Sequence, residues 1–218
     1  MAKKLDQILV VDLESTCWAG DPPPGEEHEI IEIGLCVLDV ATGERLDNPS
    51  ILVCPTCSRV SDYCHDLTTL NQEEVEGGMT LADACRILRD EYRGRSRAWA
   101  SWGDYDRKQL RRECQAKGIE YPFGDRHINV KTLFALVRGL KKEAGLDTAL
   151  EMLGFPLEGT HHRGADDAWN IARILVWLLD AARAGGEAAL ARDVEPITHT
   201  ADSHLTREAA AHRSEETA

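Results

Sequence analysis

Two carboxylates close the first apolar segment of the chain. Residues 8–11 are Ile, Leu, Val and Val, a run typical of a strand covered on both faces, and Asp12 and Glu14 follow it. Because side chains alternate along a strand, both acids project from the same face. Two like charges this close are unfavourable unless a cation neutralises them, and Mg²⁺ takes oxygen ligands of this kind. A divalent metal site is one interpretation, and an acidic strand end leading into a solvated loop is the other.

Two further acids occupy comparable places later in the chain. Asp106 precedes Leu110 by four residues beside a predicted helix over residues 107–117, and Asp167 has the same relation to the apolar stripe of a predicted helix over 166–184. At that spacing each acid shares the inward face of its helix. Asp106 is also suited to be the N-cap of its helix, which would explain it without chemistry. Buried unpaired carboxylates are costly, and a metal cluster would remove that cost.

Hydrophobic periodicity and turn signals indicate strands that alternate with helices around these acids. We expect strands at residues 8–11, 28–40, 50–54, 98–103 and 128–130. We expect a helix beginning near Asn71 and further helices over residues 80–92, 107–117, 132–140, 146–153 and 166–184. The first strand is expected to be central, with the second and third following it as a meander.

Length and composition describe an ordinary globular protein. The 218 residues, 43% hydrophobic and 29% charged, suit one domain over residues 1–182. After Gly185 and Gly186 large apolar groups become rare, so we expect residues 183–218 to form a flexible polar tail. No segment resembles a membrane span, and the first residues lack the apolar region of a secretory signal, so no membrane partner is expected.

The net charge of −13 argues against a broad basic surface for nucleic acid. Bound divalent ions and a local basic strip can still offset the repulsion where a substrate lies. One basic run is present, and it consists of Arg107, Lys108, Arg111 and Arg112. This run either follows phosphates or forms a solvated helix face.

The seven cysteines are an odd number, and most lie within apolar patterns. This usage predicts reduced thiols and a cytoplasmic location. Cys54, Cys57, Cys64 and His65 could in principle bind zinc, but a second correctly spaced pair is missing.

Three motifs of the chain resemble those of the DEDDh exonucleases, the DnaQ-like group with a ribonuclease-H-like fold. The first is Asp12-x-Glu14 after an apolar strand, and the second is Asp106, which follows a tyrosine at a helix start. The third is His162, five residues before Asp167 at the start of another helix. The resemblance covers roughly residues 6–182.

Within that group the chain is most similar to the Eri-1-like branch, which includes the 3′ histone-mRNA exonuclease and bacterial relatives. Thr69 departs from this branch, which commonly has Gly there, and Gly164 stands where proofreading relatives have Ala. Neither departure touches a catalytic position. The segments that carry the similarity are DLESTC at 12–17, HEIIEIG at 28–34, SDYCHDLTTL at 61–70 and HRGADDAWNIARIL at 162–175.

The resemblance implies an α/β, ribonuclease-H-like fold with a central mixed five-stranded sheet flanked by helices. It also implies His162 as the general base, with the adjacent His161 as the competing histidine. Two Mg²⁺ or Mn²⁺ ions would be bound by four carboxylates, those of Asp12, Glu14, Asp106 and Asp167. The terminal nucleotide would contact a further set of residues, for which loop packing is the alternative: Ser15, Thr16, Leu67, Thr68 and Leu70.

The implied reaction is hydrolysis at a 3′ end that releases nucleoside 5′-monophosphates one at a time. Single-stranded or short 3′ ends of RNA are the leading substrate, and single-stranded DNA is the alternative because no motif identifies a reader of the 2′-hydroxyl. A nonenzymatic module that binds nucleic acid or protein, and a small-nucleotide phosphatase or diesterase, also remain open. An inactive copy would be expected to have lost one of the five catalytic groups, and this chain keeps all five.

Overall fold

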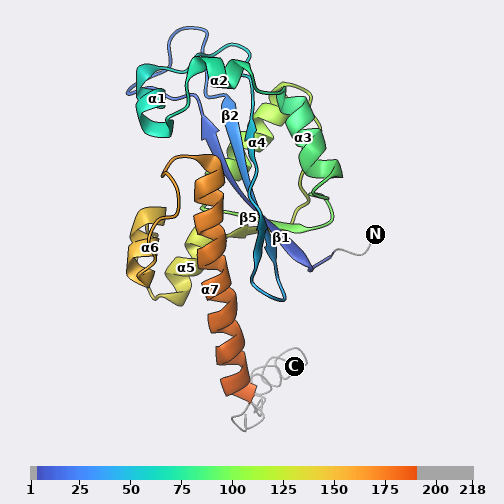
Figure 1. Cartoon of the computed structure of the whole chain (residues 1–218), viewed down its shortest axis with the longest axis vertical. Coiled ribbons are helices and arrows are strands. Elements are labelled where there is room, and N and C mark those ends of the chain that lie inside the picture. The colour runs from blue at the N-terminus through green and yellow to red at the C-terminus, as the bar shows by residue number, and fades with distance from the viewer. Residues whose placement is uncertain (1–3, 191–218) are drawn as a thin grey trace, which may run out of the picture. The chain divides into compact units, whose positions relative to one another are not determined.

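Residues 4–190 are described by a computed structural model (Figure 1). The chain divides into two units, Met1–Ala181 and Ala182–Ala218, and the first unit contains the whole sheet. Residues 191–218 lie outside the described part, so their predicted flexibility stays a prediction. Residues 183–190, predicted as the start of the flexible tail, instead continue the last helix, which ends at Leu190. No helix within residues 4–190 is long and apolar enough to cross a membrane.

Six strands form one mixed sheet in the described part of the chain, in the order β3-β2-β1-β5-β6, with β4 also paired to β2. Strand β1 is antiparallel to β2 and parallel to β5, and β5 is parallel to β6. The prediction of a mixed sheet with a central first strand is confirmed, but the expected number of five strands is wrong. The strands are β1 Gln7–Ser15, β2 Ile30–Asp39, β3 Arg45–Asp47, β4 Ser50–Leu52, β5 Ala98–Ser101 and β6 His127–Asn129.

Helices cover the sheet, and most begin within two residues of their predicted starts. Asn71 caps one of them through a capping box with Glu74, as the sequence indicated. The helices are α1 Asp62–Thr68, α2 Gln72–Glu76, α3 Leu81–Asp90, α4 Tyr105–Ala116, α5 Val130–Val137, α6 Leu146–Leu153 and α7 Gly164–Leu190.

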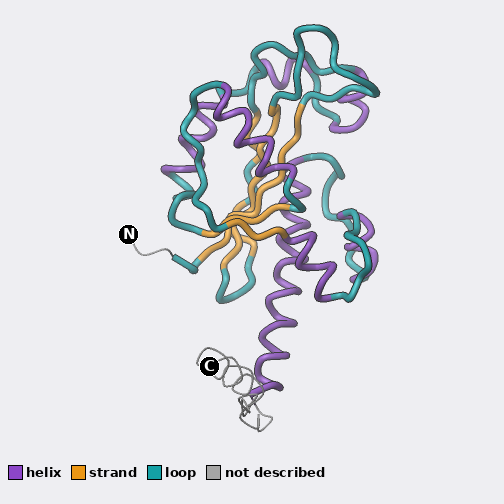
Figure 2. Tube along the Cα trace, turned by 180° about the vertical axis from the view of Figure 1, so that it is seen from behind, coloured by secondary structure: helices purple, strands orange, loops and turns teal. Residues whose placement is uncertain are grey.

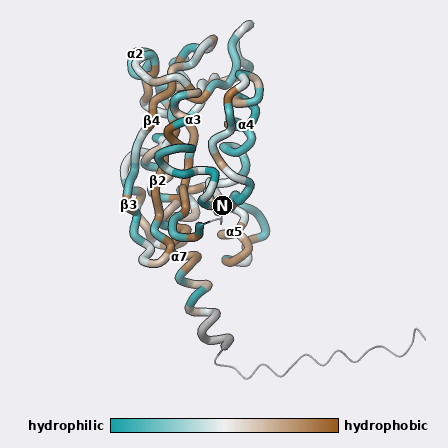
Figure 3. Tube along the Cα trace, turned by 90° about the vertical axis from the view of Figure 1, so that its right-hand side faces the viewer, coloured by the Kyte–Doolittle hydropathy of each residue, from teal (hydrophilic) through white to brown (hydrophobic). Residues whose placement is uncertain are grey.

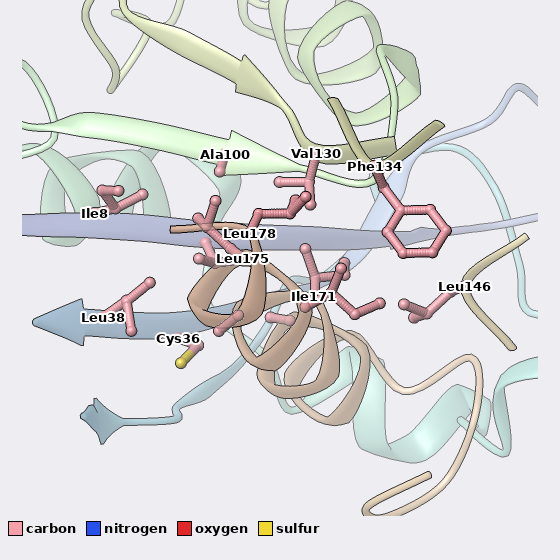
Figure 4. Close-up of a cluster of buried hydrophobic side chains, with 14 of the residues drawn as sticks. Ile8, Cys36, Leu38, Ala100, Val130, Phe134, Leu146, Ile171, Leu175 and Leu178 are labelled. Atoms are coloured by element: carbon pink, nitrogen blue, oxygen red, sulfur yellow. The ribbon is translucent and has the colours of Figure 1, made fainter. Parts of the chain in front are cut away.

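One face of the sheet packs against α5, α6 and α7. Ile8 and Val10 of β1 lie on this face, and Ile171 and Leu175 of α7 pack against it together with Phe134 of α5 (Figure 4). The same alternation that sends Ile8 and Val10 to this face sends Asp12 and Glu14 to it further along the strand. The core therefore ends where the acidic residues begin.

The opposite face of the sheet packs against α3 and α4 (Figure 2). Leu9, Val11 and Leu13 of β1 lie there with Leu88 of α3 and Leu110 of α4. Figure 3 shows the contrast between the apolar strand β2 and the largely hydrophilic α4. Because β1 is buried on both faces, its position relative to the helices on each side is fixed by packing.

Candidate active site

Strand β1 carries two of the predicted acids at its C-terminal end. Asp12 pairs with Gly34 of β2, and Glu14 pairs with Glu32, after which the register shifts. Asp12 is half-buried and Glu14 is buried. The two acids project from one face of the strand, as the period of two predicts.

The N-terminus of α7 brings Asp167 to these acids because two glycines let it approach the sheet closely. A Cβ atom added at Gly34 would lie 1.8 Å from the carbonyl carbon of Gly164, so only glycine fits there. In Figure 1 the start of α7 lies beside β1 and β2. The carboxylate oxygens of Asp12, Glu14 and Asp167 lie within 4.8 Å of one another.

Asp106 reaches the same place from α4, but not in the role of a helix cap. The N-cap position is occupied by Asp104, whose side chain makes no capping hydrogen bond, so the N-cap interpretation of Asp106 is wrong. Instead the backbone N–H of Leu13 donates to Oδ1 of Asp106 at 3.1 Å. Asp106 is 4% exposed and is fixed to the strand that carries the other acids.

The four carboxylates lie close together, and not all of them are paired with a positively charged group. Burial, followed by the charges of Asp106 and Glu14, raises the pKa of Asp12 well above its usual value. Burial, followed by the charge of Asp167, raises the pKa of Glu14 to about 9, and burial raises the pKa of Asp106 to about 7. Burial also raises the pKa of Asp167, although a hydrogen bond with His161 opposes the shift. The folded site therefore favours either protons or bound cations.

The donor set fits a hard divalent cation. Within the described residues no hydrogen bond or ion pair engages the carboxylates of Asp12 and Glu14, so their oxygens are free to bind an ion. Convergent carboxylate oxygens, here within 4.8 Å of one another, are typical of Mg²⁺ and Mn²⁺ sites. Asp106 lines the same cleft but is not one of the three that converge.

Two adjacent histidines stand at the edge of the acidic cluster. Nδ1 of His161 lies 3.0 Å from Oδ1 of Asp167, and the backbone N–H of His162 donates to Oδ2 of Asp167 at 2.9 Å. Their rings are stacked with centroids 3.9 Å apart. No hydrogen bond from the described residues engages the ring nitrogens of His162. Burial, followed by His161, lowers the pKa of His162, so its imidazole is neutral near pH 7.

Glu32 is a fifth acid at the site, and no sequence pattern had selected it. Its carboxylate is fully buried and accepts hydrogen bonds from Gly164 N at 3.0 Å and from Nε of Arg163 at 3.3 Å. Ser50 donates to its other oxygen at 2.5 Å. Glu32 thus joins the first turn of α7 to β2. Only the β1–β2 register, which places it opposite Glu14, would have identified it.

An open cleft of about 410 Å³ is lined by the four predicted acids and both histidines, whereas Glu32 lies behind its lining residues. Of the residues predicted to contact a nucleotide, Ser15 and Leu67 line this cleft. Thr16, Thr68 and Leu70 do not line it, and all three are fully buried. The hydroxyl of Thr68 donates to the Cys64 carbonyl oxygen, and that of Thr16 donates to the Glu27 carbonyl oxygen, as the packing alternative predicts.

Several other residues complete the walls of the cleft. Trp102 follows β5, and Tyr105, which is 55% exposed, is the first residue of α4. Leu146 and Asp147 come from the first turn of α6. In the sequence, the aromatic residues near Asp106 could have indicated this part of the cleft wall. The start of α6 is distant in sequence from the acidic residues and carries no motif, so it could not.

The basic run of α4 does not line the cleft. Arg107 and Arg111 lie 3.9 and 3.8 Å from Asp104 and Asp125, and Arg112 donates to a backbone carbonyl at 2.8 Å. These contacts fit the solvated-face interpretation.

Two groups in the described residues have the geometry to hold a metal ion. One is Asp12, Glu14 and Asp167, and the other is His161, His162 and Asp167. The four residues considered for zinc, Cys54, Cys57, Cys64 and His65, belong to neither.

Comparison with known proteins agrees with this geometry. The exonuclease family model (RNase_T) matches residues 9–175. The chain is 29% identical over 211 residues to the 3′-5′ exonuclease Snipper of Drosophila melanogaster, covering 87% of this chain and 74% of that protein. It is 32% identical over 186 residues to human 3′-5′ exoribonuclease 1, covering 80% of this chain but only 52% of that protein.

Solved structures of nucleases have a similar fold. The nuclease domain of 3′hExo, described as a DEDDh family member bound to rAMP, matches with a TM-score of 0.75 and 30% identity, covering 83% of this chain and 95% of that one. A complex described as 3′-end-specific recognition of a histone mRNA stem-loop by 3′-exonuclease matches with a TM-score of 0.73 and 29% identity, covering 83% of this chain and 65% of that one. These matches confirm the predicted α/β, ribonuclease-H-like fold. The chain therefore belongs to the exonuclease (RNase_T) family and, within it, to the DEDDh group.

Proposed function

We propose that this protein is a metal-dependent 3′→5′ exonuclease that releases nucleoside 5′-monophosphates from single-stranded or short 3′ ends of RNA. One observation carries the proposal. The carboxylates of Asp12, Glu14 and Asp167 converge within 4.8 Å inside an open cleft, and His162 lines the same cleft. Membership of the exonuclease family supports the same reaction class.

The residues of the site would have two roles, which are binding of the metal ions and proton transfer. Asp12, Glu14 and Asp167 would bind divalent cations, with Asp106 beside them. Bound Mg²⁺ or Mn²⁺ would supply positive charge that stabilises the developing charge on the phosphate and on the leaving 3′ oxygen. The hydrogen bond from Leu13 N holds Asp106 in place, so that the cluster is organised before substrate binds.

His162 is the proposed general base, which removes a proton from the attacking water. Its ring nitrogens have no hydrogen-bond partner among the described residues, and its lowered pKa keeps the imidazole neutral. Nδ1 of His161 is engaged with Asp167, which suits a role in positioning that carboxylate. Replacing each histidine by glutamine separates the two roles. The change at His162 should remove the acidic limb of the kcat profile, and the change at His161 should mainly raise the metal concentration needed for activity.

The preference for RNA rests on the relatives. Human 3′-5′ exoribonuclease 1 is named for RNA, and the matching solved complex contains a histone mRNA stem-loop. The chain spans about half the length of the human enzyme. Residues from β1, α1, α6 and the start of α4 line the cleft and would contact the terminal nucleotide.

Digestion of matched 5′-labelled RNA and DNA oligomers tests the proposal. With Mg²⁺ or Mn²⁺ the wild-type protein should produce a ladder that shortens from the 3′ end, with RNA degraded faster. EDTA and the Asp12→Asn variant should each abolish the ladder. Faster degradation of DNA would show that DNA, not RNA, is the preferred substrate. Oligomers that remain intact although the protein binds metal would contradict the exonuclease proposal itself.

A further inference from the structure

The two metal-capable groups of the site share one residue and differ in chemistry. Asp12, Glu14 and Asp167 offer three oxygens, whereas His161, His162 and Asp167 offer two imidazole nitrogens and one oxygen. Hard cations such as Mg²⁺ select oxygen ligands, and imidazole nitrogen suits Zn²⁺, Co²⁺ and Ni²⁺. The second group therefore has the wrong ligands for Mg²⁺ and suitable ones for a transition metal.

The three residues of the second group are near enough to one another to bind a single ion. Nδ1 of His161 lies 3.0 Å from Oδ1 of Asp167, and the ligand atoms of all three residues fall within 4.8 Å of one another. Two ligands bound to one tetrahedral Zn²⁺ at about 2.0–2.1 Å stand roughly 3.3 Å apart. The His161–Asp167 pair is already near that spacing, and side-chain rotation would have to bring the His162 nitrogen closer to the other two atoms by at most about 1.5 Å.

The local backbone holds both imidazoles on the same side of the chain. His162 has a φ of +63°, a left-handed conformation that a non-glycine residue rarely adopts. The two rings are stacked, with an interplanar angle of 23°. Adjacent residues in extended chain would direct their side chains to opposite sides. The backbone N–H of His162 also donates to Oδ2 of Asp167, which ties the turn to its third ligand.

The group is open to solvent on one side. Both histidines are half-buried, and all three residues line the 410 Å³ cleft. An ion held there would keep a coordination position that faces the cleft, where water or an anion completes the shell.

We propose that His161, His162 and Asp167 form a binding site for one Zn²⁺ or chemically similar transition metal ion, distinct from the all-oxygen site and in competition with it through Asp167. Zinc at this site occupies the imidazole of His162 and withdraws Asp167 from the carboxylate cluster. The consequence, inhibition by Zn²⁺ in the presence of excess Mg²⁺, rests on the proposed exonuclease function. The binding site itself does not.

Calorimetric titration of the EDTA-treated full-length chain with ZnCl₂ and with MgCl₂ tests the site directly. The informative variants are His161→Gln and His162→Gln, and the matched control is His65→Gln, an exposed histidine that belongs to neither metal-capable group. Loss of even an outer-shell partner weakens metal binding by about 10–100-fold, so loss of a ligand should weaken Zn²⁺ binding at least tenfold. The control should retain the wild-type Zn²⁺ affinity, and Asp12→Asn should weaken Mg²⁺ binding while leaving Zn²⁺ binding largely intact.

A spectroscopic measurement keeps the proposal testable if a histidine variant fails to fold. Wild-type protein loaded with Co²⁺ should show the visible absorption of a nitrogen-ligated ion, and Zn²⁺ but not Mg²⁺ at the same concentration should displace it. The proposal is overturned if Zn²⁺ affinity is unchanged in both folded histidine variants, or if Asp12→Asn removes Zn²⁺ and Mg²⁺ binding together. Neither measurement requires RNA cleavage, so the test of the zinc site does not depend on whether the exonuclease proposal is correct.

Discussion

The close contact between β2 and α7 allows a sharp test of how the site is positioned. Gly34 lies opposite Asp12 in the β1–β2 pair, and Gly164 begins the helix that carries Asp167. A Cβ added at Gly34 would lie 1.8 Å from the carbonyl carbon of Gly164 and 2.2 Å from the backbone nitrogen of Ala165. These neighbours are backbone atoms, which cannot rotate away as a flexible side chain would.

The Gly34→Ala substitution should therefore displace the start of α7 from the sheet. The overlapping backbone atoms must separate by about 1.7 Å to reach ordinary van der Waals contact. Overpacking of this kind typically destabilises a protein by about 1–3 kcal/mol. A misplacement of about 1 Å in a catalytic constellation can cost about 100-fold in rate. We expect a lower free energy of unfolding and a loss of about 100-fold in kcat/KM, because Asp167 moves away from Asp12.

Urea unfolding and kcat/KM on a short RNA oligomer measure the two effects. The matched control is Gly185→Ala on the same helix, where an added Cβ meets nothing within 4 Å. This control should keep wild-type activity and gain up to about 1 kcal/mol of helix stability. Wild-type kcat/KM in a folded Gly34→Ala protein would refute the reasoning that this contact positions Asp167.

Three further predictions concern charge and backbone strain. In the metal-free protein the pKa values of Glu14 and Asp106 are raised to about 9 and about 7, so the folded state binds more protons than the unfolded state. The thermal midpoint should therefore decrease as the pH is raised from about 5 to about 9, and added Mg²⁺ should restore it. A midpoint that does not change with pH would contradict this. Lys117→Met should lower the free energy of unfolding by about 1–3 kcal/mol, because Nζ lies 2.7 Å from buried Glu29 and the change removes this charged donor while the backbone N–H groups of residues 56–58 still donate to the carboxylate. An unchanged free energy of unfolding in urea would contradict it. Thr69 has a φ of +63°, so Thr69→Gly should raise the free energy of unfolding by up to about 1 kcal/mol in the same measurement, and a decrease would show that the Thr69 side chain outweighs the strain.

Elements with strong local patterns were predictable from the sequence. Helix α6 has the predicted bounds, because Gly145 precedes an apolar periodic segment and Gly154 ends it in the left-handed conformation. Strand β1 and the shared face of Asp12 and Glu14 followed from the apolar run and the period of two. These features depend on neighbouring residues alone.

Features that depend on register or tertiary packing were not predictable in the same way. Strand β3, a three-residue edge strand with polar residues, has no alternation long enough to identify it. The position of Asp106 suited an N-cap as well as a catalytic role, yet its hydrogen-bond donor is Leu13 N, 93 residues away. The role of Glu32 in fixing α7 depends on the pairing of β2 with β1.

The most direct test of the proposed function is the identity of the first product. The wild-type protein should be incubated with single-stranded RNA and Mg²⁺ in ¹⁸O-labelled water, with Asp12→Asn as the control, and the products resolved by mass spectrometry. The proposal predicts a nucleoside 5′-monophosphate that carries one ¹⁸O in its phosphate, and no such product from the variant. A nucleoside 3′-phosphate, internal fragments, or equal product from the variant would contradict hydrolysis at the 3′ end by this carboxylate cluster.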